Sequence, residues 1–461
     1  MLPTAYVLNP GRFRKGGCGV TLALCFLFPV TSQSQELGAA PDLDLLEKNL
    51  KRAMETEKFD TAESLVGQLG ATGNPRAADI IIQNAFTGNN YGVEKAAGAA
   101  ILSMKDPAVR ARVLEAAQAA KNPKPRSRII LFSLVAKFAV DDPESLGVLC
   151  AGLEDPSKPV VLTVLKKLRE LMKPESVPAL IEALEVREKK GRDRIYFDIV
   201  RNLKALTGVD LEFSADWRNY TAAHQGARPA PTRNPSGSAT GVFKRPKFFS
   251  VSVDSDRVLF VIDVSESMLQ VDPELKAPGP KEETTRSTGT TAVAKKKSPE
   301  TRKSGPSTRE RLTRVKVELI SVINSLEPKT RFGLLSFSHE LAWWGEGRGS
   351  LREASPGNKS DAVTWVRNLV ASGATRTDLA LEAALSIPDI DTILLLTDGA
   401  PRNEHNQPVD IGTILARTKE TNRFLRCRIH TISFAQIVAK RMVKFVKELA
   451  VANDGVCTML P

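Results

Sequence analysis

The chain has few cysteines and histidines, and this scarcity excludes several classes of protein. Its 461 residues include five cysteines and four histidines. No CxxC pair occurs, so a thiolate zinc site is not expected. No GxSxG or GxxxxGKS/T segment occurs either, so neither a serine-hydrolase elbow nor a phosphate-binding loop is indicated. We therefore expect a protein that is not an enzyme.

Long apolar runs are also missing. The apolar stretch from Cys18 to Val30 is too short to cross a membrane as a helix, which takes about 20 residues. Basic residues precede it and a polar segment follows, which is the layout of a secretory signal peptide covering residues 1–34. We expect cleavage after Ser34, no transmembrane anchor afterwards, and export to the periplasm, the cell envelope or the medium. A buried N-terminal helix is the alternative.

Removal of that segment leaves an odd number of cysteines. They are Cys150, Cys427 and Cys457. An odd count excludes a dense disulfide framework. Cys427 and Cys457 lie in two candidate neighbouring strands and could therefore meet in a disulfide. Buried free thiols are the expectation.

The formal net charge of +12 favours acidic partners. Much of the excess lies in one polar segment, residues 270–311, and on scattered helix faces. A solvated surface therefore explains the charge, and no specific nucleic-acid binding is expected. The segment 270–311 is rich in Lys, Thr, Ser and Pro, which predicts a disordered basic insertion.

The length exceeds what one hydrophobic core usually holds, so we expect two structured domains. Residues 42–225 read as successive helices, and similar segments start at Asp106, Asp142 and Lys173, about every 35 residues. Aspartate and proline at such starts suit helix N-termini. The segments resemble HEAT-like repeats, which stack into a solenoid whose concave side commonly binds protein. A structural spacer is the alternative.

The second domain is expected over residues 248–461, after a Pro/Gly/Ser-rich linker at 226–247. Buried strands and helices alternate there, which predicts a doubly wound α/β layer. The expected strands are 258–263, 331–337, 341–344, 392–397, 428–434 and one near 456. The expected helices are 313–326, 361–370, 378–385, 411–421 and 440–451.

Oxygen-bearing side chains cluster where the predicted strands of this second domain end. The candidate ligands are Asp263, Ser265, Ser267, Thr375 and Asp398. Asp263 and Asp398 each close a buried strand, and ligands of open parallel sheets gather at the carboxyl ends of the strands. Two carboxylates and three hydroxyls, without sulfur or imidazole, suit Mg²⁺ or Mn²⁺. If the hydroxyls bind directly and the carboxylates act partly through water, the metal keeps much of its positive charge for an outside carboxylate.

The segments DVSES, SGATRT and LLLTDG, in this order, resemble the metal-ion-dependent adhesion site of a von Willebrand factor A (vWA) domain. The resemblance covers residues 248–461 and implies a Rossmann-like fold. It also implies metal ligation by the five candidate residues, with a sixth position for an acidic group of a protein partner. Glu266 departs from the family, because a small residue is common there, and its carboxylate could compete with a ligand.

These observations predict an exported, bacterial-type binding or adhesion protein. Its vWA domain would bind an acidic protein partner through the metal, and its helical repeats would offer a second protein-binding surface. One alternative is a scaffold assembled through the repeats. Another is a metal-dependent phosphoryl-transfer hydrolase with Asp263 as the nucleophile. The hydrolase is disfavoured because Ser265 occupies the place where a second acid would be needed.

Overall fold

The computed structural model describes residues 42–224, 245–272, 309–345, 349–403, 405, 407–435 and 440–461. The predicted signal peptide, most of the linker and most of the 270–311 insertion lie outside these residues. Leu43–Pro461 form one compact unit. No helix in the described part of the chain combines the length and the apolar character needed to span a membrane.

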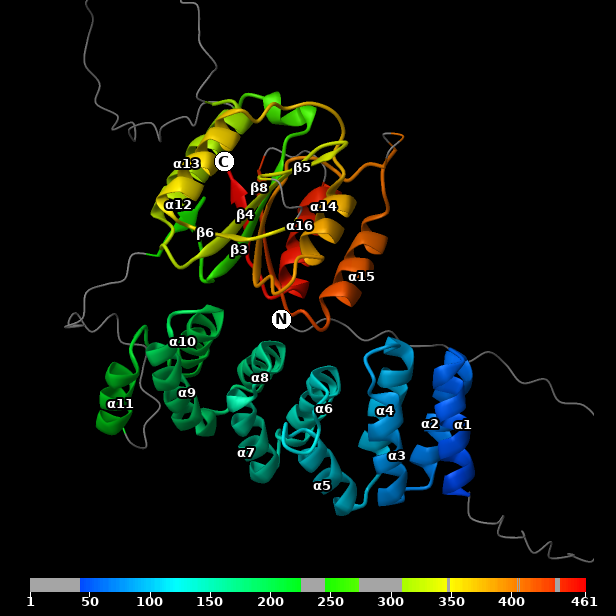
Figure 1. Ribbon diagram of the computed structural model, residues 1–461. Coiled ribbons are helices and arrows are strands. Elements are labelled where there is room, and N and C mark those ends of the chain that lie inside the picture. Colours follow the sequence, from blue (N-terminus) through cyan, green and yellow to red (C-terminus); the bar gives the residue numbers. More distant parts are fainter. Residues whose placement is uncertain are drawn as a thin grey trace, which may run out of the picture. The chain divides into compact units, whose positions relative to one another are not determined.

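The region from Leu43 to Ala223 is helical. Its helices are α1 (Leu43–Glu55), α2 (Phe59–Ala71), α3 (Pro75–Ala85), α4 (Tyr91–Ser103), α5 (Pro107–Ala116), α6 (Pro125–Phe138), α7 (Pro143–Ala151), α8 (Lys158–Leu171), α9 (Val177–Lys190), α10 (Arg194–Thr207) and α11 (Ser214–Ala223), with 3-10 turns η1 (Gly152–Glu154) and η2 (Pro174–Ser176). Helices one and two places apart in the chain pack together, as α2 does with α4 and α6 with α8 (Figure 1). One hydrophobic cluster extends from Leu46 to Trp217.

Two of the three predicted repeat starts have the expected cap. The Asp106 carboxylate accepts a hydrogen bond from the N–H of Ala108 at 2.8 Å, and Asp142 accepts one from Ser145 at 2.9 Å. Proline opens both helices. The third start differs, because Lys173 has no acceptor to offer and the turn η2 precedes α9.

The remaining described chain forms a hairpin and a larger sheet. The hairpin pairs β1 (Lys247–Phe248) with β2 (Val251–Ser252). The sheet contains β3 (Arg257–Asp263), β4 (Arg331–Phe337), β5 (Leu341–Trp343), β6 (Arg352–Glu353), β7 (Thr392–Leu396), β8 (Arg428–Phe434) and β9 (Cys457–Leu460). Its order is β5-β4-β3-β7-β8-β9, with β6 also beside β4. All neighbours pair in parallel except β5 and β6. Strand order therefore reverses around β3.

Helices cover both faces of this sheet (Figure 1). Helices α12 (Arg311–Ser325) and α13 (Pro356–Arg367) lie on one face, and α14 (Thr377–Leu385), α15 (Ile411–Asn422) and α16 (Lys440–Ala452) lie on the other. Phe260 packs into the first layer and Leu259 into the second, and both are fully buried. Burial on both faces explains the continuous apolar run of β3. The α/β prediction for this region is confirmed.

Most predicted elements occur within a few residues of their expected bounds, and β4 and β8 match them. Helix α13 is an exception, because it begins at Pro356 and not at residue 361. The Ser355 hydroxyl accepts a hydrogen bond from the N–H of Asn358 at 3.3 Å and caps the helix. A Ser-Pro pair is a helix-start signal that the sequence analysis missed.

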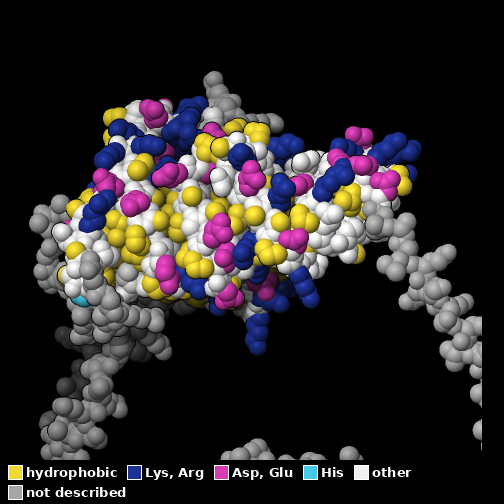
Figure 2. All heavy atoms as spheres, turned by 90° about the horizontal axis from the view of Figure 1, so that it is seen from below, with side chains coloured by type: hydrophobic (Ala, Val, Ile, Leu, Met, Phe, Trp, Pro, Cys, Tyr) yellow, Lys and Arg dark blue, Asp and Glu magenta, His cyan; other side chains and the backbone are white. Residues whose placement is uncertain are grey.

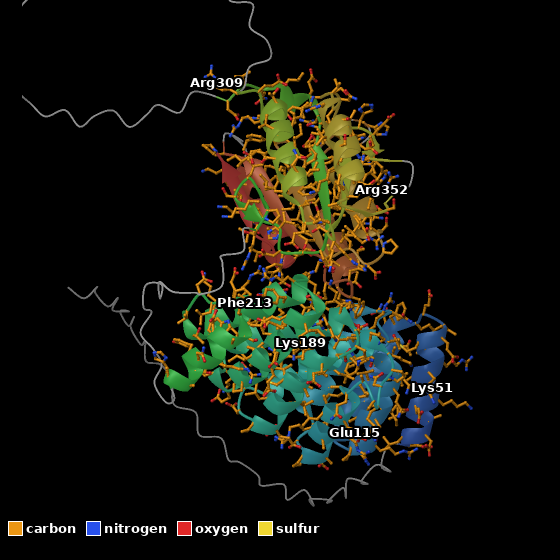
Figure 3. The ribbon with its side chains drawn as sticks, turned by 60° about the vertical axis from the view of Figure 1, so that its left-hand side comes forward. Lys51, Glu115, Lys189, Phe213, Arg309 and Arg352 are labelled. Carbon is orange, nitrogen blue, oxygen red and sulfur yellow. The ribbon has the colours of Figure 1, made fainter. Side chains whose placement is uncertain are left out.

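Both described ends of the predicted insertion, residues 270–272 and 309–311, have a defined structure. The carbonyl of Gln270 accepts a hydrogen bond from the N–H of Arg311 at 3.0 Å. The N–H of Asp272 donates to the carbonyl of Arg309 at 3.1 Å (Arg309 is labelled in Figure 3). Asp272 and Arg311 are each 4% exposed. The prediction is wrong at both ends of the segment, because Asp272 and Arg311 are buried as an ion pair, with Nε of Arg311 2.9 Å from Oδ1 of Asp272.

The three described cysteines have free thiols. Cys427 is buried at the start of β8, and burial raises the pKa of its thiol to about 12. Cys457 lies in β9, which pairs with β8. Both thiols are free, as expected, but Cys457 is only partly buried.

Ion pairs join the helical region to the sheet region. Arg428 of β8 binds the Asp198 carboxylate of α10. Arg423 donates to the Glu94 carboxylate of α4 at 2.6 Å. Lys158 of α8 binds the Asp391 carboxylate, which precedes β7. The ends of α4, α8 and α10 that make these contacts are therefore not available to a separate partner.

Elsewhere the surface charges are mixed. Figure 2 shows acidic and basic side chains interspersed on the face that it displays. Exposed ion pairs in the described part of the chain include Lys204 with Asp210 and Arg218 with Glu185. On the part of the face in Figure 2 that is not grey, side chains of the two charge signs alternate.

We expect stability to fall below neutral pH because of His430. This β8 residue is 5% exposed, and its Nδ1 accepts a hydrogen bond from the N–H of Val456 at 3.1 Å. Burial, followed by the charges of Arg428 and Arg201, lowers the pKa of His430 from 6.5 to about 3. At pH 5 the unfolded chain therefore binds a proton that the folded chain does not, so unfolding becomes easier as pH falls.

This group should lower the free energy of unfolding by about 2 kcal/mol between pH 7 and pH 5. Urea unfolding at both pH values measures the loss, and His430→Gln should remove that share of it. An equal pH dependence in wild type and variant would show that His430 is not responsible.

Candidate metal centre

The candidate site lies at the carboxyl ends of β3 and β7, which are neighbours in the sheet. Asp263 is the last residue of β3, and Asp398 lies two residues beyond β7. The loop that carries Thr375, between α13 and α14, is tied to the β3 end because the N–H of Ser372 donates to the carbonyl of Val264 at 2.8 Å. Three segments far apart in the sequence therefore meet at one edge.

Asp263 anchors the first segment. Its side chain is fully buried, and its Oδ1 accepts a hydrogen bond from the N–H of Ser265 at 2.8 Å. Its Oδ2 accepts one from the Thr397 hydroxyl at 2.6 Å. The Ser265 and Ser267 hydroxyl oxygens are 3.1 Å apart. The alternating serines therefore place both hydroxyls on the same side of the loop.

The other two segments complete the cluster. The Ser267 hydroxyl donates to Oδ1 of Asp398 at 2.6 Å. The Thr375 hydroxyl oxygen would lie only 2.5 Å from a Cβ placed on Gly399, so a side chain at 399 would displace Thr375. The structure thus brings all five predicted residues to one place, and glycine next to Asp398 is a steric requirement of that arrangement.

The site brings two carboxylates together in a buried setting. Burial, followed by the charge of Asp398, raises the pKa of Asp263 from 3.8 to about 7. A buried carboxylate beside a second carboxylate, as Asp263 is, resists ionisation unless positive charge is supplied. The electrostatics of the cluster therefore favour a cation.

Part of that positive charge comes from Arg311, which sequence analysis did not assign to the site. Its Nη1 donates to Oδ2 of Asp398 at 2.8 Å, and its Nε donates to Oδ1 of Asp272 at 2.9 Å. The prediction placed both Arg311 and Asp272 in the disordered insertion. The sequence does contain a signal that Arg311 belongs to a helix. The helical spacing of apolar residues in α12 starts at Leu312, which places Arg311 in the first turn of the helix.

The donor set fits a hard cation. Among the described residues, no group of three or more His, Cys, Asp or Glu side chains is placed to hold a metal ion. A site here must therefore combine the two carboxylates with the hydroxyls, an all-oxygen set that suits Mg²⁺ or Mn²⁺ better than zinc. Glu266 is exposed beside the cluster and adds a further carboxylate at its rim.

Comparison with known proteins agrees with the vWA resemblance. No family model matches the chain. A stretch of 152 residues, 32% of this chain, is 32% identical to human von Willebrand factor A domain-containing protein 3B and covers 11% of it. A stretch of 165 residues, 33% of this chain, is 27% identical to human inter-alpha-trypsin inhibitor heavy chain H4 and covers 17% of it.

Among solved structures, a von Willebrand factor type A protein from Catenulispora acidiphila matches 44% of this chain and 38% of its own, with 17% identity and a TM-score of 0.32. A TM-score this low supports no conclusion about this chain. The curated matches support homology between part of this chain and vWA domains. They cover less than a fifth of those relatives' length, so nothing about the relatives' whole activity transfers to this chain.

Proposed function

We propose that the protein is a non-enzymatic binding protein whose sheet region binds Mg²⁺ or Mn²⁺ and, through the metal, an acidic side chain of a protein partner. Asp263, Ser265, Ser267, Thr375 and Asp398 would hold the ion. A bound divalent cation would supply positive charge to which an outside carboxylate can bind.

The observation that carries this proposal is the convergence of three hydroxyls on two buried carboxylates. The direct contacts run from Ser265 to Ser267 and from Ser267 to Asp398. Three hydroxyls and two carboxylates make five ligands, so a six-coordinate cation keeps one position for the carboxylate of a partner. Ser267 is partly exposed, so the cluster can be reached from solvent.

The hydrolase alternative receives less support. A nucleophilic carboxylate needs an oxygen that is free to attack. Asp263 has no exposed surface, and each of its oxygens already accepts a hydrogen bond, from Ser265 and Thr397 respectively. Ser265 also stands where a second acid would be required.

The scaffold alternative concerns the helical region. We propose that α1–α11 form a HEAT-like solenoid, and the stacking of helices one and two places apart supports this. Ion pairs to the sheet region occupy the ends of α4, α8 and α10. A second protein-binding surface would therefore have to use the other helix faces.

We also propose that the protein is exported. Export is supported by the basic residues and the short apolar run of the first 34 residues. N-terminal sequencing of the mature protein from its own host tests it, and a chain that begins near Gln35 is expected.

Capture of a partner tests the proposed function. The tagged protein would be used to capture proteins from the cell-envelope fraction in 5 mM Mg²⁺, roughly a saturating level for a site of this kind. We expect partners that elute with chelator and return when Mg²⁺ is restored. Partners that stay bound in chelator would favour the scaffold function. The matched bait is a variant that lacks the metal-site charge, Asp263→Asn.

A further inference from the structure

The guanidinium of Arg311 is held on three sides at the candidate metal centre. It donates to Asp398 at 2.8 Å and to Asp272 at 2.9 Å, and its central carbon lies 5.0 Å from the ring centroid of Phe434. Its side chain is 5% exposed. Such a buried, fully paired arginine has a fixed position, unlike a surface arginine that samples many rotamers.

This contact changes what Asp398 can offer a metal. Its Oδ1 accepts a hydrogen bond from Ser267 and its Oδ2 accepts one from Arg311. A divalent cation bound to Asp398 would therefore share this carboxylate with the guanidinium of Arg311, which is held in place. Like charges repel strongly where the surroundings exclude water, so Arg311 opposes the entry of a second cation.

We infer that Arg311 is a positioning residue that keeps Asp398 in place when no metal is bound and that holds the metal affinity of the site low. The inference rests on the proposed metal-binding function. A partner carboxylate adds the negative charge that Arg311 offsets. Metal and acidic partner should therefore bind cooperatively, each raising the affinity of the other.

Substitutions at two neighbouring residues, Asp272 and Arg314, test this role of Arg311. Asp272 offsets the charge of Arg311, so removal of the Asp272 carboxylate should weaken cation binding at the site. Arg314 also binds Asp272 and donates to the carbonyl of Pro461 at 3.2 Å, yet no described contact joins it to Asp398. Arg314 is therefore the matched control for loss of an arginine that touches Asp272.

The experiment measures Mn²⁺ affinity of the full chain by isothermal titration calorimetry after chelator treatment. Arg311→Gln should lower the Kd at least tenfold, which corresponds to about 1.4 kcal/mol. Asp272→Asn should raise the Kd several-fold, and Arg314→Gln should leave it within about twofold of wild type. The melting temperature of Arg311→Gln should be lower than that of wild type in chelator and should rise more on adding Mn²⁺.

A purely structural role for Arg311 predicts a different outcome. Arg311→Gln and Asp272→Asn would then shift the Kd in the same direction, or Arg311→Gln would behave like Arg314→Gln, and either result overturns the inference. Should Arg311→Gln fail to fold, an unchanged or lowered Kd in Asp272→Asn overturns it. Absence of Mn²⁺ binding in both wild type and Arg311→Gln instead overturns the proposed metal site itself.

Discussion

Asp198→Asn should lower the free energy of unfolding by about 3–5 kcal/mol. Asp198 lies on α10 and is 4% exposed. Its carboxylate binds Arg428 of β8, accepts a hydrogen bond from Arg201 at 2.8 Å and lies 3.5 Å from Nε of Arg194. Removal of the Asp198 charge would leave Arg428, Arg194 and Arg201 close together, although Asp254 would still pair with Arg201 at 3.2 Å. The loss should be large because this cluster also joins the helical region to the sheet region.

The ionisation of Asp198 explains why the full effect is expected at neutral pH. Burial alone would raise its pKa, but the charges of Arg428 and Arg194 more than offset burial and hold the pKa of Asp198 well below its usual range. A lowered carboxylate pKa contributes stability above the unfolded value of about 4, and this contribution is lost as pH falls below it.

Chemical denaturation followed by circular dichroism at pH 7 measures the change. The control is Asp210→Asn, because Asp210 pairs with Lys204 of the same helix but both side chains are about half exposed. Such a surface pair should contribute under about 1 kcal/mol. Equal losses in the two variants would mean that the buried cluster does not stabilise the contact between the regions.

Asp263→Asn should abolish the stabilisation that Mg²⁺ gives the wild-type protein. A ligand that binds only the folded chain adds about 2.7 kcal/mol at a hundredfold excess over its Kd. The variant should gain nothing, because a neutral amide replaces a carboxylate that the metal needs. The fold should survive, since the amide can still accept the hydrogen bond from the N–H of Ser265.

The raised pKa of Asp263 is a second reason to expect that Asp263→Asn folds. Because burial and the charge of Asp398 raise that pKa to about 7, the metal-free protein already resists the charged form. A neutral side chain should therefore cost little in chelator. Thermal melts with and without Mg²⁺ give the comparison.

The control for this experiment is Glu266→Gln. Glu266 is an exposed carboxylate next to the cluster and is not one of the five candidate ligands. Glu266→Gln should keep most of the stabilisation that Mg²⁺ gives the wild-type protein. No gain in the wild type, or an undiminished gain in Asp263→Asn, would refute metal binding at this site.

Local sequence signals predicted the sheet region well. The bounds of β4 and β8 agree with the predicted 331–337 and 428–434, because both segments contain β-branched or aromatic residues, which favour strands. The five candidate ligands could be named because each stands at a strand end or at a helix start. Parallel strands bring their carboxyl ends to one edge, so sequence position alone implied their proximity.

Features that depend on distant partners could not be predicted in this way. Asp272 and Arg311 lie at the ends of a long polar segment and were assigned to it, because composition describes a segment as a whole. Their burial follows from pairing with each other and with Asp398, which are contacts across 39 and 87 residues of sequence.

The sequence by itself determined the helical region, the alternating strands and helices, and the set of hard oxygen ligands, since these depend on periodicity and side-chain chemistry near one position. Only the tertiary structure decided that Arg311 shares Asp398 and that Asp198 joins α10 to β8. A buried charge is stable only beside its partner. No local pattern records which distant residue that partner will be.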